Sequence, residues 1–355
     1  AQKRIHGSLS LEVAKCNTSL GLHLINKGNY ELAKEYLLES YAYKDAHLGV
    51  HTEALIDVAA LGIVYARTNM PELAELMLLK DVDQTKILCG EESIEFATSC
   101  NNLGVFFRTE GRLEEAALHL QSALTCRMQN LGPNSLKVAN TLSNLGVLKS
   151  HKNDYNAAAE FHSRALIISI RCLGSSHPHT LIKMINKAAN LKRQKRYSDA
   201  KSLYQQILSI TQSSNAIPFE IIDTAATNYI NLLDFLEEPH AKVGVYQLLI
   251  SVINENDDSD IQALTNNLLS LAHTFREISE YENAEKYYLE TLVIEQRELG
   301  ANHADIAITY YNLGQVIAYQ TRYSDAEKYF QKTLEIELME LDEEDPELTM
   351  TFLWL

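Results

Sequence analysis

The sequence predicts an all-α protein: a right-handed superhelical solenoid of eight antiparallel helix-turn-helix repeats. A small residue recurs within apolar segments at intervals of 42 residues, and an alanine follows it after a further 12. Self-similarity at a period of about 20–50 residues is typical of stacked repeat proteins. Stacked units bury one continuous core, so a chain of 355 residues does not have to divide into separate globular domains.

The first helix of each repeat is identified by its small residue. Small side chains allow two helices to approach closely, and we expect each helix to run about 14 residues, or about 21 Å. The first interval is 41 residues, and each later one is 42. The eight positions are Gly21, Gly62, Gly104, Gly146, Ala188, Ile230, Ala272 and Gly314.

The second helix carries the alanine, and in most repeats a large apolar side chain follows four residues later. We expect that side chain to fill the space opposite the small residue of the first helix. Lys242 replaces the alanine in the sixth repeat. The alanines are Ala33, Ala74, Ala116, Ala158, Ala200, Ala284 and Ala326, and the large side chains include Leu37, Leu78, Leu120, Tyr204, Tyr246, Tyr288 and Phe330.

Turn and helix-end signals separate the helices. Gly or Asn followed by an aromatic or leucine side chain marks the turn inside a repeat, as in Gly28-Asn29-Tyr30. A Leu-Gly pair ends the second helix, because glycine readily adopts the left-handed conformation that closes a helix. These pairs are Leu48-Gly49, Leu131-Gly132, Leu173-Gly174 and Leu299-Gly300.

The repeats predict four segments: residues 1–212 with repeats one to five, 213–258 with a degenerate repeat six, 259–346 with repeats seven and eight, and 347–355 with the start of a ninth helix pair. Repeat six has Ile230, Lys242 and Pro239 at atypical positions and is read either as a helical pair or as a hinge. Because the chain begins with Ala1 and stops inside this ninth unit, we expect it to be part of a longer protein. We expect Leu348, Phe352 and Leu355 to pack on repeat eight as a cap.

Composition excludes several classes of protein. The net charge of −16 argues against general nucleic-acid binding. Half of that charge comes from Glu335–Glu347. We interpret this segment as a solvated face or linker, or else as a docking site for a basic partner or another copy of the chain. No apolar run is long enough to span a bilayer, and no secretory signal is visible. Five cysteines without CxxC spacing indicate reduced thiols and therefore a cytoplasmic protein. We expect no membrane insertion, and association with the cytoskeleton is one option.

Catalytic signals are lacking. The sequence contains no phosphate loop, no GxGxxG, no GxSxG and no HExxH motif. His47 and His51 are four residues apart, but Gly49 between them belongs to a loop, so we do not expect a metal site. The sequence therefore predicts a protein that is not an enzyme and that needs no cofactor or metal.

The 42-residue unit resembles the tetratricopeptide repeat of kinesin light chains and their relatives. The resemblance rests on stretches such as Leu173-Gly174 with His177-Pro178, and Asn101-Asn102-Leu103-Gly104 with Gly111-Arg112-Leu113 and Ala116. It implies a groove on the concave side, lined by the first helices, that binds peptides. In kinesin-light-chain-like repeats, asparagines at matching positions belong to that groove.

Six asparagines are the first group of candidate groove residues. Asparagine recurs two residues before the small residue, and a side-chain amide can pair with a peptide backbone whatever its side chains. The alternative is that each amide bonds the neighbouring helix. The candidates are Asn101, Asn102, Asn144, Asn186, Asn228 and Asn312.

Basic residues are the second group. Arg108, Lys192 and Arg276 share one position of the repeat, four residues after the small residue, and Lys183–Lys201 holds seven bases against Asp199. A cationic groove would favour an acidic peptide segment. The alternative is an ordinary solvated face.

These features predict a non-catalytic interaction scaffold or adaptor that binds a peptide or partner helix in its groove, with its oligomeric state open. Two alternatives remain: a structural component of a cytoskeletal or ciliary assembly, and the sensor end of a multidomain signalling protein.

Overall fold

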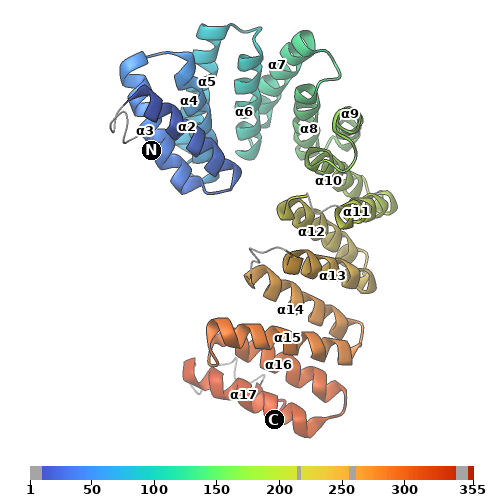
Figure 1. Ribbon diagram of the computed structural model, residues 1–355. Helices are drawn as coiled ribbons and strands as arrows, with labels where there is room; N and C mark the ends of the chain where they lie inside the picture. Colours follow the sequence, from blue (N-terminus) through green and yellow to red (C-terminus); the bar gives the residue numbers. More distant parts are fainter. Residues whose placement is uncertain (1–9, 214–216, 256–260, 341–350) are drawn as a thin grey trace. The chain divides into compact units, whose positions relative to one another are not determined.

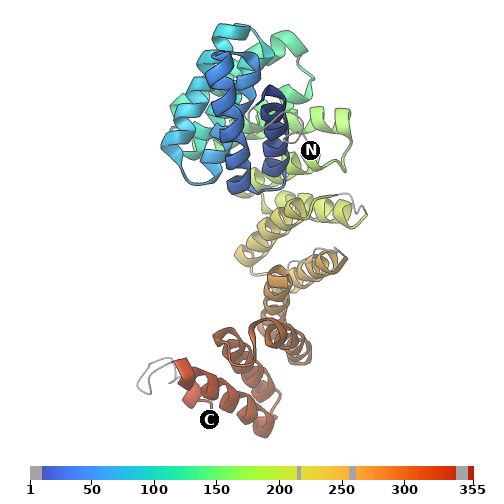
Figure 2. The ribbon, with the colours of Figure 1, turned by 60° about the vertical axis from the view of Figure 1, so that its left-hand side comes forward.

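A computed structural model describes residues 10–213, 217–255, 261–340 and 351–355 (Figure 1). These residues form 16 helices and no strand, so the predicted all-α repeat fold is confirmed. The chain divides into two compact units, Ala1–Lys195 (unit 1) and Arg196–Leu355 (unit 2). In each unit, helices joined by short turns pack as antiparallel pairs (Figures 1 and 2).

The helices follow the predicted order and are 16 to 19 residues long, longer than the sequence analysis suggested. Unit 1 contains α2 (Leu11–Asn26), α3 (Tyr30–Leu48), α4 (Thr52–Arg67), α5 (Pro71–Cys89), α6 (Ile94–Thr109), α7 (Leu113–Leu131), α8 (Leu136–His151), α9 (Tyr155–Leu173) and α10 (Pro178–Arg193). Unit 2 contains α11 (Tyr197–Gln212), α12 (Phe219–Phe235), α13 (Pro239–Glu255), α14 (Ile261–Glu277), α15 (Tyr281–Leu299), α16 (Ala304–Tyr319) and α17 (Tyr323–Glu340). Repeats one to four are the successive pairs from α2 and α3 to α8 and α9, and repeats six to eight are those from α12 and α13 to α16 and α17. In repeat five, α10 ends unit 1 and α11 begins unit 2.

Where the small residue of the first helix is glycine, it lies against the residue of the second helix that was predicted to face it. A β-carbon built on Gly62 would lie 2.7 Å from Cγ of Leu78, and one on Gly104 would lie 2.8 Å from Cγ of Leu120. Repeat four departs from the pattern, because His162 takes the place of the large apolar residue beside Gly146. Glycine in the first helix therefore lets these two helices approach more closely than a residue with a β-carbon would allow.

The predicted alanines are buried, and the exception in repeat six has a physical explanation. Ala116, Ala158 and Ala200 expose none of their surface. Lys242 is accommodated because its ammonium group lies 2.8 Å from carboxylate oxygens of both Asp234 and Glu277. Repeat six forms two helices, α12 and α13. The link between α11 and α12 contains residues 214–216, which lie outside the described part of the chain.

The turn inside every repeat places one residue in the left-handed region. Glycine or asparagine occupies this position in repeats one to four, as the turn signal predicts. Repeats five to eight use other residues, and Thr321 in repeat eight has a φ of 63° although its side chain is β-branched. The second helices end as predicted, because Gly132 and Gly174 follow them with φ of 76° and 86°.

A buried polar pair links each of several repeats to the next. One partner lies near the end of a second helix, and the other lies in the first turns of the following helix. Lys44 and Asp57, with 2.8 Å between Nζ and Oδ2, form the pair between repeats one and two. The other hydrogen-bonded junction pairs are Thr85 with Ser99 at 3.1 Å, and Arg127 with Thr141 at 2.7 Å.

The chain end packs on repeat eight through other residues than predicted. Thr351 donates to Glu337 at 2.9 Å, in the same pattern as the junction pairs, and the ring of Trp354 stacks on Phe330 with 5.4 Å between centroids. Phe352 and Leu355, the expected contacts, are 53% and 48% exposed, so that prediction was wrong. The indole ring of Trp354 covers Phe330, and the neighbouring residues Phe352 and Leu355 remain exposed to solvent. Leu348 and the part of the acidic cluster at residues 341–347 lie outside the described residues.

Candidate binding surface

The first helices of unit 1 lie side by side, because α4, α6, α8 and α10 each contact the next. The candidate residues Asn101, Asn102, Arg108, Asn144 and Asn186 all lie on α6, α8 and α10 and are half-buried. Residues of this kind are neither sealed in the core nor fully solvated. We call the surface that carries these five residues the unit 1 groove face, after the groove that the sequence predicts.

Two of the asparagines form hydrogen bonds across repeat junctions. Asn144 donates from Nδ2 to Oδ1 of Asn101 at 3.1 Å, and Asn186 donates to Oγ of Ser143 at 3.2 Å. In both cases, the amide reaches the residue 43 positions earlier, on the preceding first helix. Each bond uses only one of the amide's hydrogen-bonding groups, which include two N–H donors and a carbonyl acceptor.

A buried guanidinium lies beneath this surface, and the sequence analysis did not single it out. Arg127 of α7 is 4% exposed and donates to Thr141 at 2.7 Å and to Thr98 at 3.2 Å. It also reaches Oδ1 of Asn101 at 3.4 Å. These acceptors are all neutral, so the positive charge is solvated by hydroxyl and amide dipoles and not by a carboxylate.

Charge is distributed unequally along the chain. Unit 1 has 22 Lys and Arg against 19 Asp and Glu, a net charge of +3, whereas unit 2 has 9 against 28, a net charge of −19. The two groove helices α8 and α10 together contain six basic residues and no acid. Lys183 is buried and Lys149 pairs with Asp154 at 3.8 Å, so the positive charge on the surface of α8 and α10 comes mainly from Lys137, Lys187, Lys192 and Arg193.

Three basic side chains gather where α6, α8 and α10 end. Burial lowers the pKa of His151, and the neighbouring charges of Arg108 and Arg193 lower it further. Burial also lowers the pKa of Arg108, whose Nε has no hydrogen-bond partner among the described residues. Cations at helix C-termini interact favourably with the helix dipole, which stabilises this arrangement.

The remaining candidates lie on different helices. Lys192 lies on α10 and is half-buried. Asn228 is half-buried on α12 of unit 2, and Asn312 is buried on α16. Arg276 on α14 donates from Nη1 to Oδ1 of Asn312 at 2.9 Å and to Oε1 of Gln315 at 2.8 Å. Unit 2 thus brings two predicted residues together, but their bond lies within the stack.

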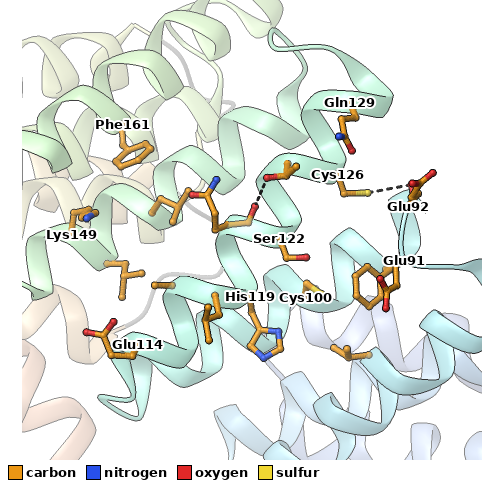
Figure 3. Close-up of a pocket in the computed structure, with 18 of the residues that line it drawn as sticks. Glu91, Glu92, Cys100, Glu114, His119, Ser122, Cys126, Gln129, Lys149 and Phe161 are labelled. Atoms are coloured by element: carbon orange, nitrogen blue, oxygen red, sulfur yellow. Dashed lines mark hydrogen bonds between the residues drawn. The ribbon is translucent and has the colours of Figure 1, made fainter.

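A hollow of about 1050 Å³ surrounds the second helix α7, away from the residues predicted from the sequence (Figure 3). Phe96 and Cys100 of α6 and Phe161 of α9 contribute to its lining, and Leu118 of α7 is 72% exposed there. The Cys126 thiol donates to the carbonyl oxygen of Glu92 at 3.3 Å. Burial raises the pKa of the Cys100 thiol to about 11, so this thiol stays protonated and unreactive at neutral pH.

The described residues also bear on metal binding, cysteine pairing and membrane crossing. No group of three or more His, Cys, Asp or Glu side chains that would suit a metal ion occurs in the described residues. The five cysteines are free thiols. Among the described helices, none is long and apolar enough to cross a membrane.

Comparisons with known proteins agree with the fold. A sequence model of the tetratricopeptide repeat matches residues 95–166 and 262–337. Curated relatives are clustered mitochondria protein homologs, with 24% identity over 151 residues in Aspergillus terreus and 21% over 229 residues in Emericella nidulans. These matches cover 42% and 61% of this chain but only 12% and 18% of the relatives.

Solved structures add a fold-level likeness. BtubC (BKLC) from P. vanneervenii is 22% identical with a TM-score of 0.50, over 59% of this chain and 83% of that one. A structure of kinesin light chain nearly identical TPR-like repeats from Podosopora anserina is 17% identical with a TM-score of 0.48, over 58% and 98% of the two chains.

The chain is therefore a helical-repeat protein, and tetratricopeptide repeats, which the sequence analysis predicted, are detected at residues 95–166 and 262–337.

Proposed function

We propose that this chain is a non-catalytic protein-interaction module that binds an extended acidic peptide segment on the unit 1 groove face. One observation carries the proposal: α8 and α10 contain six basic residues and no acid, although the whole chain has a net charge of −16. Tetratricopeptide repeats commonly mediate contacts between proteins. A cationic surface selects a partner of opposite charge and accelerates its approach.

The arrangement of polar groups supports an extended ligand. Asn101, Asn144 and Asn186 lie in successive repeats and are held in place by bonds to their neighbours. Fixed amides lose little conformational entropy when they bind a peptide backbone, and the cations at the helix ends add charge recognition. The matched stretch makes up 12–18% of the clustered mitochondria protein homologs, so we assign an interaction role and not the activity of those whole proteins.

The test uses a fluorescein-labelled peptide of alternating glutamate and serine, with a glutamine-serine peptide as the uncharged control. Titration of the full chain should raise fluorescence polarisation with the acidic peptide alone. Arg193→Glu, at an exposed site of the face, should weaken binding about tenfold. Arg164→Glu makes the same charge change on α9 and should have no effect.

Two results would reject the proposal. One is equal binding of the glutamate and glutamine peptides. The other is equal weakening by Arg193→Glu and Arg164→Glu, which would reflect net charge and not a site. Added salt should weaken a true surface interaction, since the Debye length falls to about 3 Å at 1 M.

The hollow around α7 favours one alternative, a structural component that contacts its neighbours through the second helices. Leu118→Glu would replace an apolar side chain that is 72% exposed there with a charged one. If this variant breaks an assembly isolated with the full-length protein while Arg193→Glu leaves it intact, the structural role is the correct one.

A further inference from the structure

Unit 2 contains a separate cleft of about 730 Å³, formed by α13, α14, α15 and α16 of repeats six to eight. Three tyrosines from three different repeats line it: Tyr246, Tyr281 and Tyr319. The rings of Tyr281 and Tyr319 stack with 5.3 Å between centroids and 29° between planes. Tyr319 is 49% exposed, so part of its ring is available to a ligand.

The charges in this cleft are largely neutralised, unlike those of the unit 1 groove face. Lys242 pairs with both Asp234 and Glu277, each at 2.8 Å. Unit 2 as a whole has a net charge of −19, which repels an anionic ligand. The cleft is therefore better suited to an uncharged ligand than to an acidic one.

The cleft offers several hydrogen-bond donors. The side-chain oxygen of Gln315, and that of Asn312 behind it, already accept bonds from Arg276. Glu277 accepts from Lys242. The other N–H groups of Arg276 and the hydroxyl groups of Tyr281 and Tyr319 make no hydrogen bond within the described residues, and an arginine side chain has five N–H groups in all.

A proline-rich segment matches both properties. Each proline residue presents a carbonyl acceptor and has no backbone N–H, so it suits a cleft that offers donors. Its ring packs on flat aromatic faces, and a polyproline II helix loses little entropy on docking because it is already ordered. We propose that the tyrosine-lined cleft of unit 2 binds a proline-rich segment of a partner protein in the polyproline II conformation.

This inference rests on the proposed interaction role but not on the acidic ligand of unit 1. The two sites lie on different helices and differ in charge. A chain with both sites would recognise two chemically distinct segments, one acidic and one rich in proline.

The experiment titrates the full chain with an acetylated, amidated decaproline peptide in a calorimeter. Trp354, the single tryptophan, lies 6.0 Å from the Tyr319 ring, so its fluorescence provides a second readout near the cleft. We expect binding with a Kd between about 10 μM and 1 mM, typical of affinities of about 4–7 kcal/mol. The emission of Trp354 should change with the same titration curve.

Variants locate the binding. Tyr319→Ala should weaken it about tenfold, because a stacked aromatic contact and its buried area are lost. Tyr319→Phe keeps the ring and should lose much less. Tyr323→Ala is the matched control, since Tyr323 is 68% exposed at the start of α17 and does not line the cleft. Arg276→Gln, which removes donors, should also weaken binding.

Three results would overturn the proposal. The first is absence of decaproline binding at the highest concentration. The second is an equal loss in Tyr319→Ala and Tyr323→Ala. The third is binding of the glutamate-serine peptide in place of decaproline, with Arg276 required. Arg193→Glu should leave decaproline binding unchanged, so failure of the unit 1 proposal is distinguishable from failure of this one.

Discussion

Asn144 donates a hydrogen bond to Asn101 across the junction of repeats three and four, with 3.1 Å between Nδ2 and Oδ1. The same oxygen of Asn101 also faces Arg127 and Thr141, each at 3.4 Å. One amide carbonyl therefore connects the groove face to a buried charge. If this surface binds the peptide proposed above, amides held by such contacts should lose little conformational entropy on binding.

We predict that Asn101→Ala destabilises the protein by about 1–3 kcal/mol, because it removes the acceptor of Asn144 and one of several acceptors of Arg127. Its neighbour Asn102 is equally half-buried but makes no hydrogen bond with its side chain among the described residues. Asn102→Ala should therefore change stability by no more than about 0.5 kcal/mol. Urea unfolding followed by circular dichroism measures both. Equal effects would show that the junction contact is unimportant.

Gly104→Ala should destabilise unit 1. The added β-carbon would lie 2.8 Å from Cγ of Leu120 and 3.2 Å from the carbonyl oxygen of Ala116, and overpacking of this kind costs about 1–3 kcal/mol. Gly244→Ala is the control, because nothing lies within 4 Å of the new atom on α13. Alanine is a better helix former, so that variant should gain about 1 kcal/mol. A stabilised Gly104→Ala would contradict the close approach.

Thr321→Gly should stabilise repeat eight. A β-branched residue with a φ of 63° is strained, and the left-handed conformation costs about 1–2 kcal/mol for residues other than glycine. Gly111→Thr makes the opposite change at the equivalent turn of repeat three and should destabilise by a similar amount. Melting temperatures from calorimetry should therefore move in opposite directions. Shifts of the same sign would exclude the conformational explanation.

His162 should make unit 1 sensitive to acid. Burial lowers the pKa of this side chain from 6.5 to about 4, with smaller contributions from Arg193 and Lys187. Because the folded pKa is depressed, stability is fully present above pH 6.5 and decreases as the pH falls toward 4. The loss should reach about 2–3 kcal/mol, and His162→Leu should remove it. Unfolding free energies at several pH values between 7 and 4 test this.

Asp81 should have the opposite effect. Burial raises the pKa of its carboxyl from 3.8 to about 6, against the hydrogen bonds from Ser99 and Thr85. The folded state thus binds the proton more tightly, and stability increases as the pH falls from about 6 toward 4. Asp81→Asn should abolish that increase and stabilise the protein at pH 7 by about 1–3 kcal/mol. A variant with unchanged pH dependence would show that the carboxyl is better solvated than its burial indicates.

The sequence predicted the fold closely because the repeat fixes the contacts that matter. Gly62 with Leu78 and Gly104 with Leu120 were expected, and they touch. Lys242 was recognised only as an exception, since its partners Asp234 and Glu277 lie on two different helices. Nothing in a periodic pattern shows such a contact, because it depends on single substitutions.

The candidate site was predicted less fully. Position in the repeat identified Asn101, Asn144 and Arg276, but it did not show which of their groups the stack already uses. Arg127 was missed because the equivalent position holds Lys44 in repeat one and Thr85 in repeat two, so the repeat shows no shared residue type there. The tyrosine cleft was missed for a related reason, since its walls come from three repeats.

The junction pairs have a consequence for how the chain assembles itself. Lys44 pairs with Asp57, Thr85 with Ser99 and Arg127 with Thr141, so each of these seams has its own chemistry. A repeat moved to another place would present an unmatched ammonium, carboxylate or guanidinium to its new neighbour in the dry interior. Because the junction pairs differ, a repeat that stacks on the wrong neighbour loses its polar partner. The pairs therefore favour one order of stacking over the others.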